Sequence, residues 1–257
     1  MDVHNQLKEL SGFLADYSTS LMAVGVQTSR VVKNSSRISA SFNCELDMTI
    51  FQKTIIMTLR NKENSHSYST VSKIKSLPLN FAINSRLSTL SWEAYDHHLS
   101  LEELKARYHE IISEPRENEW VVLFLVAIAN ASFCRLFQGD LISMGIVFVA
   151  TLFGFRLRQI LLHRHWNHFA VFIISSFVAS MIGSAGYLFQ IGKTPEMALG
   201  TSVLFLIPGV PLINSIMDTI DGHVLAATSR FINAILLIIC IAIGLSLTLL
   251  ITNISAL

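Results

Sequence analysis

The chain has 257 residues, of which 51% are hydrophobic and 14% charged, and its mean hydropathy of +0.51 is unlike that of an ordinary soluble domain. Its 19 basic and 18 acidic side chains nearly cancel, which argues against a nucleic-acid partner. Residues 1–119 hold 27 of the 37 Lys, Arg, Asp and Glu residues, so two regions of different character are expected.

Residues 3–24 are expected to form an amphipathic helix. Apolar side chains recur there at alternating spacings of four and three, which places them on one helical face. A coiled-coil seam would also fit, but a stripe that ends at Gly25 favours a helix packed on its own domain. The stripe consists of Val3, Leu7, Leu10, Leu14, Tyr17, Leu21 and Val24.

A change of period to two predicts a strand over residues 38–46. Residues 54–60 alternate in the same way, and residues 68–71 suggest a further strand, so we expect a hairpin or meander. The apolar positions of the first strand are Ile38, Ala40, Phe42, Cys44 and Leu46.

Two helices are expected to complete this domain. The first covers residues 79–96, and a capping box of Ser100 and Glu103 begins the second, which Pro115 ends. The result is a small α+β domain of residues 1–115. Because the first long apolar run begins near residue 120, too late for a cleaved signal peptide, this domain is expected in the cytoplasm.

The domain shows no pattern typical of an enzyme, a metal site or a cofactor site. His98 and His109 would face each other across a helical turn, but no Glu or Cys stands at ligand spacing. The three cysteines form no C-x-x-C pair, and nucleophile-elbow, phosphate-loop and zincin motifs are absent from the sequence. We therefore expect no enzyme activity, no metal and no cofactor.

Residues 120–257 are expected to form a membrane domain of about five helices, which makes the chain a mainly α-helical, multi-pass membrane protein. Each apolar segment has about the 20 residues that a helix needs to cross a bilayer. With a cytoplasmic N-terminus, the inner turns hold most of the arginines, as the positive-inside rule requires. The segments are residues 120–137, 141–162, 168–190, 196–220 and 228–252.

The odd number of segments suggests an incomplete transporter. Secondary carriers are commonly built from paired repeats, and the sequence shows no convincing second copy. A partner protein, or a second copy in a homodimer, is expected to supply the other half.

The fourth segment contains a helix-breaking motif, Pro208, Gly209 and Pro211. Two prolines remove two backbone donors, so a continuous helix would leave the carbonyls of Leu204 and Ile207 without partners. A broken helix in a membrane is a pointer to a substrate site. A purely structural kink is an equally good interpretation of the motif alone.

Asn214, Asp218 and Asp221 follow at helical spacings that place them on one face. A carboxylate in a membrane span is costly and usually functional, which makes Asp218 a candidate for proton or cation coupling. In the alternative interpretation, both aspartates lie beyond the hydrocarbon and solvate the helix end, with Arg230 as a partner. For Asp221 that alternative is favoured, and for Asp218 the two are balanced.

The run from Ile207 to Asp218, with Gly222 and Arg230, resembles the signature of the threonine/serine exporter family, in its N-terminal half. The resemblance also includes Gly25-x-x-Thr28 and covers essentially the whole chain. A chain that stops at Leu257 is similar to the stand-alone larger subunit of split systems, which works with a small membrane partner in succinate export.

The resemblance implies export of threonine, serine or a dicarboxylate such as succinate across the bacterial inner membrane. Substrate is then expected to pass the Pro208–Pro211 break, Asn214, Asp218 and Arg230. Arg156 and Arg158 would also attract a carboxylate, although the positive-inside rule explains Arg156 and Arg164 more simply. A membrane-embedded enzyme would need a catalytic pair within the apolar segments, and the sequence offers none. A membrane-anchored sensor or scaffold remains the alternative function.

Overall fold

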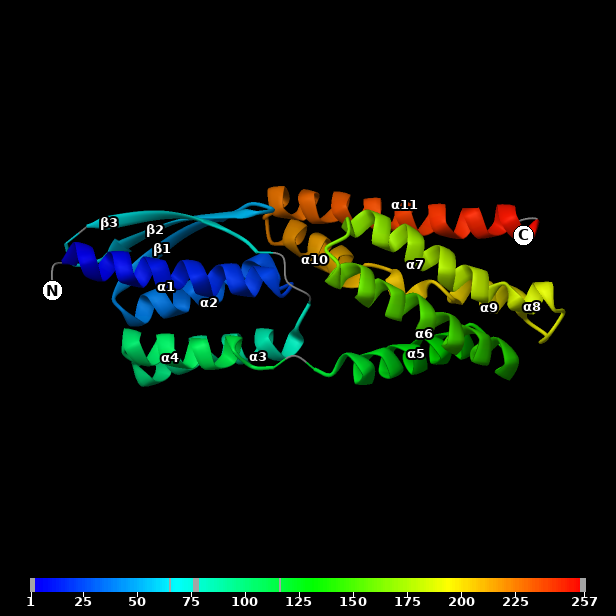
Figure 1. Cartoon of the computed structure of the whole chain (residues 1–257). Coiled ribbons are helices and arrows are strands. Elements are labelled where there is room, and N and C mark those ends of the chain that lie inside the picture. Colours follow the sequence, from blue (N-terminus) through cyan, green and yellow to red (C-terminus); the bar gives the residue numbers. More distant parts are fainter. Residues whose placement is uncertain (1–2, 65, 76–78, 116, 255–257) are drawn as a thin grey trace. The chain divides into compact units, whose positions relative to one another are not determined.

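The computed structural model describes residues 3–64, 66–75, 79–115 and 117–254 (Figure 1). These group into two compact units. The first comprises Met1–Pro115 and Val210–Ile232, and the second comprises Arg116–Gly209 and Asn233–Leu257. The cytoplasmic location of residues 1–115 and the membrane location of residues 120–257 stay predictions.

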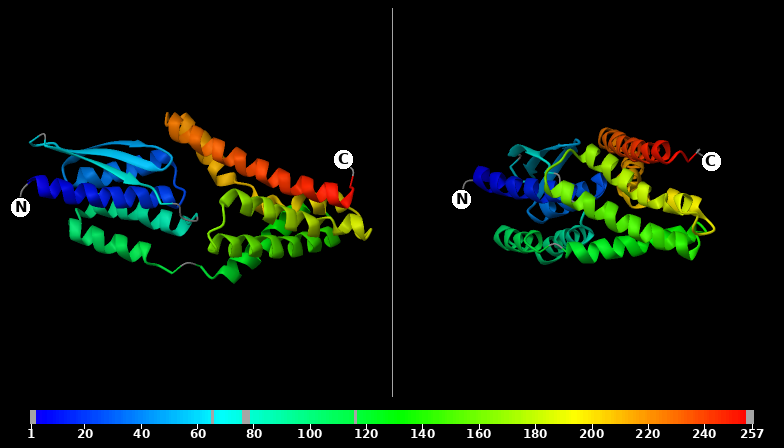
Figure 2. Two further views of the ribbon diagram at one scale, coloured as in Figure 1. Left: turned by 45° about the horizontal axis from the view of Figure 1, so that its top comes forward. Right: turned by 45° about the vertical axis from the view of Figure 1, so that its right-hand side comes forward.

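The N-terminal part of the first unit has three layers, which the two views of Figure 2 also show. A sheet covers one side of a pair of helices, α1 (Val3–Ala23) and α2 (Thr28–Ser41). Two further helices, α3 (Phe81–His97) and α4 (Leu101–Ile112), lie on the other side (Figure 1). The predicted helix of residues 3–24, the helix of residues 79–96 and the α+β character of this part are confirmed.

The strand predicted over residues 38–46 is wrong in its first half, because residues 38–41 end helix α2. The buried side chains of α2 follow helical spacing, but several are polar, so the hydrophobic pattern did not reveal the helix. A left-handed Asn43 (φ 55°) then separates α2 from the first strand. The buried residues are Thr28, Val31, Asn34, Ser35, Ile38 and Ser39.

The predicted meander is confirmed. Strands β1 (Cys44–Ile50), β2 (Thr54–Asn61) and β3 (Ser67–Lys73) form an antiparallel sheet in the order β1-β2-β3. Alternate side chains of β1 and β2 are buried beneath the sheet, as strand periodicity requires. The register pairs Leu46 with Leu59 and Met57 with Thr70.

One apolar core joins these layers. Leu14, Leu21, Ile55, Leu87 and Leu104 are all within it and fully or almost fully buried. The predicted capping box is present at the start of α4, where Ser100 and Glu103 bind each other's backbone N–H groups.

The apolar part of the chain, from Glu119 to Thr252, consists of helices whose bounds agree with those of the predicted segments. The described residues contain four continuous spans of sufficient length and hydropathy, and a fifth if a broken helix pair is counted as one. The four are α5 (Glu119–Leu136), α6 (Leu141–His163), α7 (His168–Gly183) continued by α8 (Ala185–Leu188), and α11 (Val224–Thr252). The broken pair consists of α9 (Pro195–Thr201) with η1 (Leu204–Leu206), followed by α10 (Gly209–Ile220).

Small and hydroxylated side chains fill the interior of the second unit. Ser180 Oγ on α7 lies 2.7 Å from Thr248 Oγ1 on α11, and both residues are fully buried. Asn130 on α5 donates to Thr151 Oγ1 on α6 at 2.7 Å and to the carbonyl of Thr201 at 3.2 Å. Such contacts are typical of helices that pack against one another in a membrane.

Candidate functional site

The proline motif interrupts the helix, as the sequence predicted. Helix α9 ends at Thr201, a single 3₁₀ turn follows, and α10 begins only at Gly209. Pro208 therefore lies outside a helix, and Pro211 lies in the first turn of α10, where its missing N–H group has no helical partner to lose. Because the chain turns instead of continuing as a helix, Leu204 O accepts from Ile207 N and Ile207 O accepts from Gly209 N.

Asp218 on α10 is the most completely buried charged group near this motif, with an exposed fraction of 0%. Its Oδ1 accepts the backbone N–H of Thr28, and its Oδ2 accepts the Thr28 hydroxyl, both at 2.9 Å. Arg230 Nη1 on α11 lies 3.3 Å from the same Oδ2. All three residues belong to the first unit, and we call them the Asp218 cluster.

The start of α2 explains why a carboxylate is stabilised here. Thr28 is the first residue of α2, and the preceding Gln27 makes no side-chain capping bond. The first N–H groups of a helix lack internal partners and carry the positive end of the helix dipole. Asp218 therefore serves as a capping acceptor that comes from a distant part of the chain.

A glycine turn supplies the second contact with α10. Gly25 lies between α1 and α2 with φ 90°, and a Cβ at this position would overlap with the Leu79 side chain. Its carbonyl accepts a 2.8 Å hydrogen bond from Asn214 Nδ2, one helical turn before Asp218. The Gly25-x-x-Thr28 motif thus binds both polar residues on this face of α10.

Arg230 contacts the same turn through its other nitrogen. Nη2 donates to the carbonyl of Val26 at 2.9 Å and lies 3.4 Å from Met22 Sδ. Asp221 does not join this group, because α10 ends at Ile220 and Asp221 is exposed. Because Asp218 is buried, the alternative in which it lies in solvent at the helix end is wrong for this residue. The ion pair between Asp218 and Arg230 that the same alternative expected is present.

Asn214, Asp218 and Arg230 were predicted as site residues, whereas Gly25 and Thr28 had no predicted role. Their spacing after the first helix was visible only as part of the family resemblance. No local pattern around Thr28 indicates a partner 190 residues away.

The arginines of α6 differ in their partners. Arg156 Nη1 lies 3.2 Å from Glu119 Oε2 and 3.1 Å from Gln159 Oε1. Arg158 makes no hydrogen bond or ion pair within the described part of the chain, and its buried Nε has no partner there. Its guanidinium carbon instead lies 5.6 Å from the ring centroid of Phe155 and 5.2 Å from that of Phe172. Among the described residues, Arg158 is therefore a cation without a carboxylate partner.

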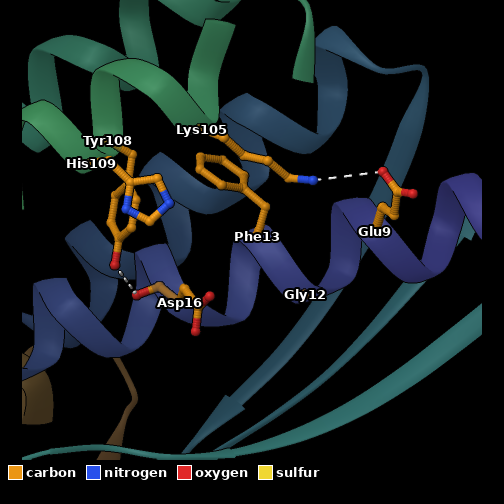
Figure 3. A pocket seen from close by; sticks show the side chains of 7 residues that line it. All are labelled: Glu9, Gly12, Phe13, Asp16, Lys105, Tyr108 and His109. Atoms are coloured by element: carbon orange, nitrogen blue, oxygen red, sulfur yellow. Dashed lines mark hydrogen bonds and ion pairs between the residues drawn. The ribbon is translucent and has the colours of Figure 1, made fainter. Parts of the chain in front are cut away.

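A cavity of about 240 Å³ lies between α1 and α4 (Figure 3). The Tyr108 hydroxyl lies 2.7 Å from Ser20 Oγ and donates to the Asp16 carbonyl at 3.2 Å, and burial raises its pKa. A tyrosine in this state is not an activated nucleophile. The described lining, which contains no Ser, Thr or Cys, consists of Glu9, Gly12, Phe13, Asp16, Lys105, Tyr108 and His109.

Comparison with known proteins gives the family. The family model for the threonine/serine exporter (ThrE) matches residues 13–252. The chain is 27% identical to "Probable succinate transporter subunit YjjP" of Escherichia coli K12 over 234 residues, 89% of each chain. It is 25% identical to the protein of the same name from Klebsiella aerogenes over 228 residues, which cover 87% of this chain and 86% of the relative.

No solved structure gives a significant match. The family and both relatives are transport proteins rather than enzymes. The family model covers most of the chain, from the middle of α1 to the end of α11. The chain therefore belongs to the threonine/serine exporter family.

Proposed function

We propose that this chain is the larger subunit of a secondary exporter that moves small carboxylate-bearing metabolites out of the bacterial cytoplasm. It works with a smaller membrane subunit in the inner membrane, and its N-terminus is cytoplasmic. The family name supports threonine or serine as substrates, whereas the names of the two relatives support succinate. All three substrates carry a carboxylate, and succinate carries two.

The observation that supports this function is the buried Asp218 cluster, which follows an interrupted apolar helix. Charged side chains in apolar helices are costly and are usually retained for transport or coupling. We assign Pro208, Gly209 and Pro211 to the break in the substrate pathway and Asn214 and Arg230 to its polar lining. Asp218 is the coupling group, which exchanges its contacts with Thr28 and Arg230 for a proton or cation during transport.

Arg158 is our choice for binding the substrate carboxylate. Arg156 is paired with Glu119, and Arg230 is paired with Asp218, so each already has a carboxylate partner. Arg158 has none among the described residues, and a guanidinium group is well suited to carboxylate binding. The positive-inside rule alone accounts for its charge but not for its unpartnered, buried Nε.

An export assay in cells that also express the smaller subunit tests this function. Asp218→Asn is expected to abolish succinate, threonine or serine efflux, because the amide cannot take up a proton as a carboxylate does. Asp221→Asn is the matched control, since Asp221 carries the same charge but is exposed and outside the cluster. Efflux that is unchanged in Asp218→Asn would remove this residue from the mechanism.

Two further measurements separate binding from coupling and from misfolding. Arg158→Gln is expected to raise the substrate concentration needed for half-maximal efflux, whereas Thr28→Ser, which keeps the hydroxyl, is expected to export normally. Membrane levels of each variant show whether loss of export follows from loss of protein. Purified protein that binds substrate but gives no flux with its partner in vesicles would favour the sensor or scaffold alternative.

A further inference from the structure

We propose that the groove between α2 and α3 is a binding site for a small soluble dianion, distinct from the substrate pathway. The groove has a volume of about 740 Å³, within the range of small-molecule sites. The transport residues assigned above do not line it. Its lining residues are Gln27, Ser29, Arg30, Lys33, Asn34, Arg37, Phe81, Asn84, Ser85, Ser88, Thr89 and Trp92.

The floor of the groove is held by hydrogen bonds between the two helices. Asn34 Nδ2 on α2 donates to Ser88 Oγ on α3 at 3.0 Å. Arg37 Nη1 donates to Ser91 Oγ at 2.6 Å and to Asn34 Oδ1 at 3.0 Å. These bonds hold α2 and α3 side by side and parallel, with both N-termini at the same end, and the groove lies between the two helices.

The charge of the groove is unbalanced. Arg30, Lys33 and Arg37 line it, and none of its described lining residues is Asp or Glu. Neither Arg30 nor Lys33 makes a hydrogen bond or ion pair to another described residue, and the acceptors of Arg37 are neutral. Three cations in one groove repel one another, and an anion with two charges relieves that repulsion.

Two details argue against a merely solvated basic surface. The Arg37 guanidinium lies 3.5 Å from the centroid of the Trp92 ring, so it is stacked and restrained in position. Asn84 Oδ1 is buried and has no hydrogen-bond partner within the described chain. A buried polar atom without a partner is costly. The hydroxyl of monohydrogen phosphate, or a water molecule that bridges to a carboxylate of succinate, would donate to it.

The ligand chemistry follows from these groups. Three cations at one face favour a phosphate or a dicarboxylate over a monoanion, and the fork of Arg37 is suited to bidentate contact with either. The aromatic side chains Phe81 and Trp92 border the groove and are more than half exposed, so the ligand has apolar contacts available as well.

Calorimetric titration of the full chain in detergent tests this site, with succinate and inorganic phosphate as separate probes. Acetate at matched ionic strength controls for unspecific screening. We expect saturable binding of at least one dianion and much weaker binding of acetate. Arg30→Gln and Arg37→Gln are each expected to weaken binding by about tenfold or more, the effect of losing one charge-assisted hydrogen bond.

Arg60→Gln is the matched control, because Arg60 is an exposed cation of β2 that lies outside the groove. This variant is expected to bind the dianions as the unmodified chain does. Arg158→Gln separates this site from the substrate pathway, since it is expected to impair export without changing titration of the groove. Equal weakening by Arg37→Gln and Arg60→Gln, or no saturable binding of either dianion to folded protein, would overturn the proposal. Binding that requires added anionic lipid, with both soluble dianions inactive, would overturn it too.

Discussion

The two units of the molecule distribute their apolar side chains in opposite ways. The first buries large ones, such as Leu14, Leu21 and Leu87, in a continuous core. The second exposes large ones, such as Phe124 and Leu125, and its buried positions include many small residues. The small buried residues of α7 are Ser175, Ser176, Ala179, Ser180 and Gly183.

This difference is the one expected if the first unit lies in water and the helices of the second are surrounded by lipid. Water drives large apolar groups into the first core, whereas helices surrounded by lipid gain nothing from hiding leucine. Small residues in the second unit instead allow backbones to approach closely. Segment 210–232 combines both behaviours, because Ile213, Ile216 and Ile220 are exposed while Asn214 and Asp218 face the turn between α1 and α2.

The largest effect that tests this comparison is expected from leucine truncation in the first unit. Leu14 is fully buried, so Leu14→Ala should destabilise the first unit by about 2–5 kcal/mol through lost contacts and a cavity. Leu125 is 60% exposed, and Leu125→Ala should change stability by only about 0.5 kcal/mol. Hydrogen exchange of the sheet amides in detergent measures the first effect, and a similar cost at both positions would contradict the comparison.

A smaller effect is expected from enlarging a glycine in the second unit. A Cβ at Gly244 of α11 would overlap with Ser176 Oγ and approach the Ile173 carbonyl to 2.5 Å. Gly244→Ala should therefore cost about 1–3 kcal/mol by overpacking. Gly145→Ala is the control, because a Cβ there meets nothing within 4 Å. Thermal midpoints of the two variants in detergent should differ clearly, and equal midpoints would mean that close backbone approach is unimportant.

The smallest effect concerns pH and the loop at Asp140. Hydrogen bonds from Ser143, from the Lys193 N–H and from Thr194 hold the pKa of the Asp140 carboxyl well below its usual range. The stability that this carboxylate contributes is therefore complete above its unfolded pKa of about 3.9 and is lost as the pH falls toward the folded value.

The thermal midpoint of the full chain in detergent, measured at falling pH, tests this dependence. Asp140→Asn should lower the midpoint at neutral pH, and the difference from the unmodified chain should shrink in acid. A difference that stays constant across the acid range would show that the carboxylate charge is not responsible.

Much of this fold was predictable because its patterns are local. The stripe of the first helix, the alternation of residues 54–60 and the apolar segments each depend on neighbouring residues. Helix α2 was missed because Asn34, Ser35 and Ser39 are buried although polar, so hydrophobicity does not mark its inner face. The side chains that bury them come from distant parts of the chain.

The candidate site was predictable in its α10 residues but not in their partners. Helical spacing placed Asn214 and Asp218 on one face, and the pairing of Asp218 with Arg230 was a stated alternative. Thr28 and Gly25 could not be found in this way, because hydrogen bonds between α10 and the turn after α1 have no signature in local sequence.

The bond between Thr28 and Asp218 can form only late in the synthesis of the chain, because Asp218 is made long after Thr28. The two residues are 190 positions apart, which at about 5–20 residues per second corresponds to roughly 10–40 s of synthesis. During that interval the first turn of α2 already exists, but the carboxylate that caps it has not yet been synthesised. The N-terminal layers are thus synthesised first but gain this bond only after α10 has left the ribosome, and the apolar segments that precede α10 are all synthesised before the bond can form.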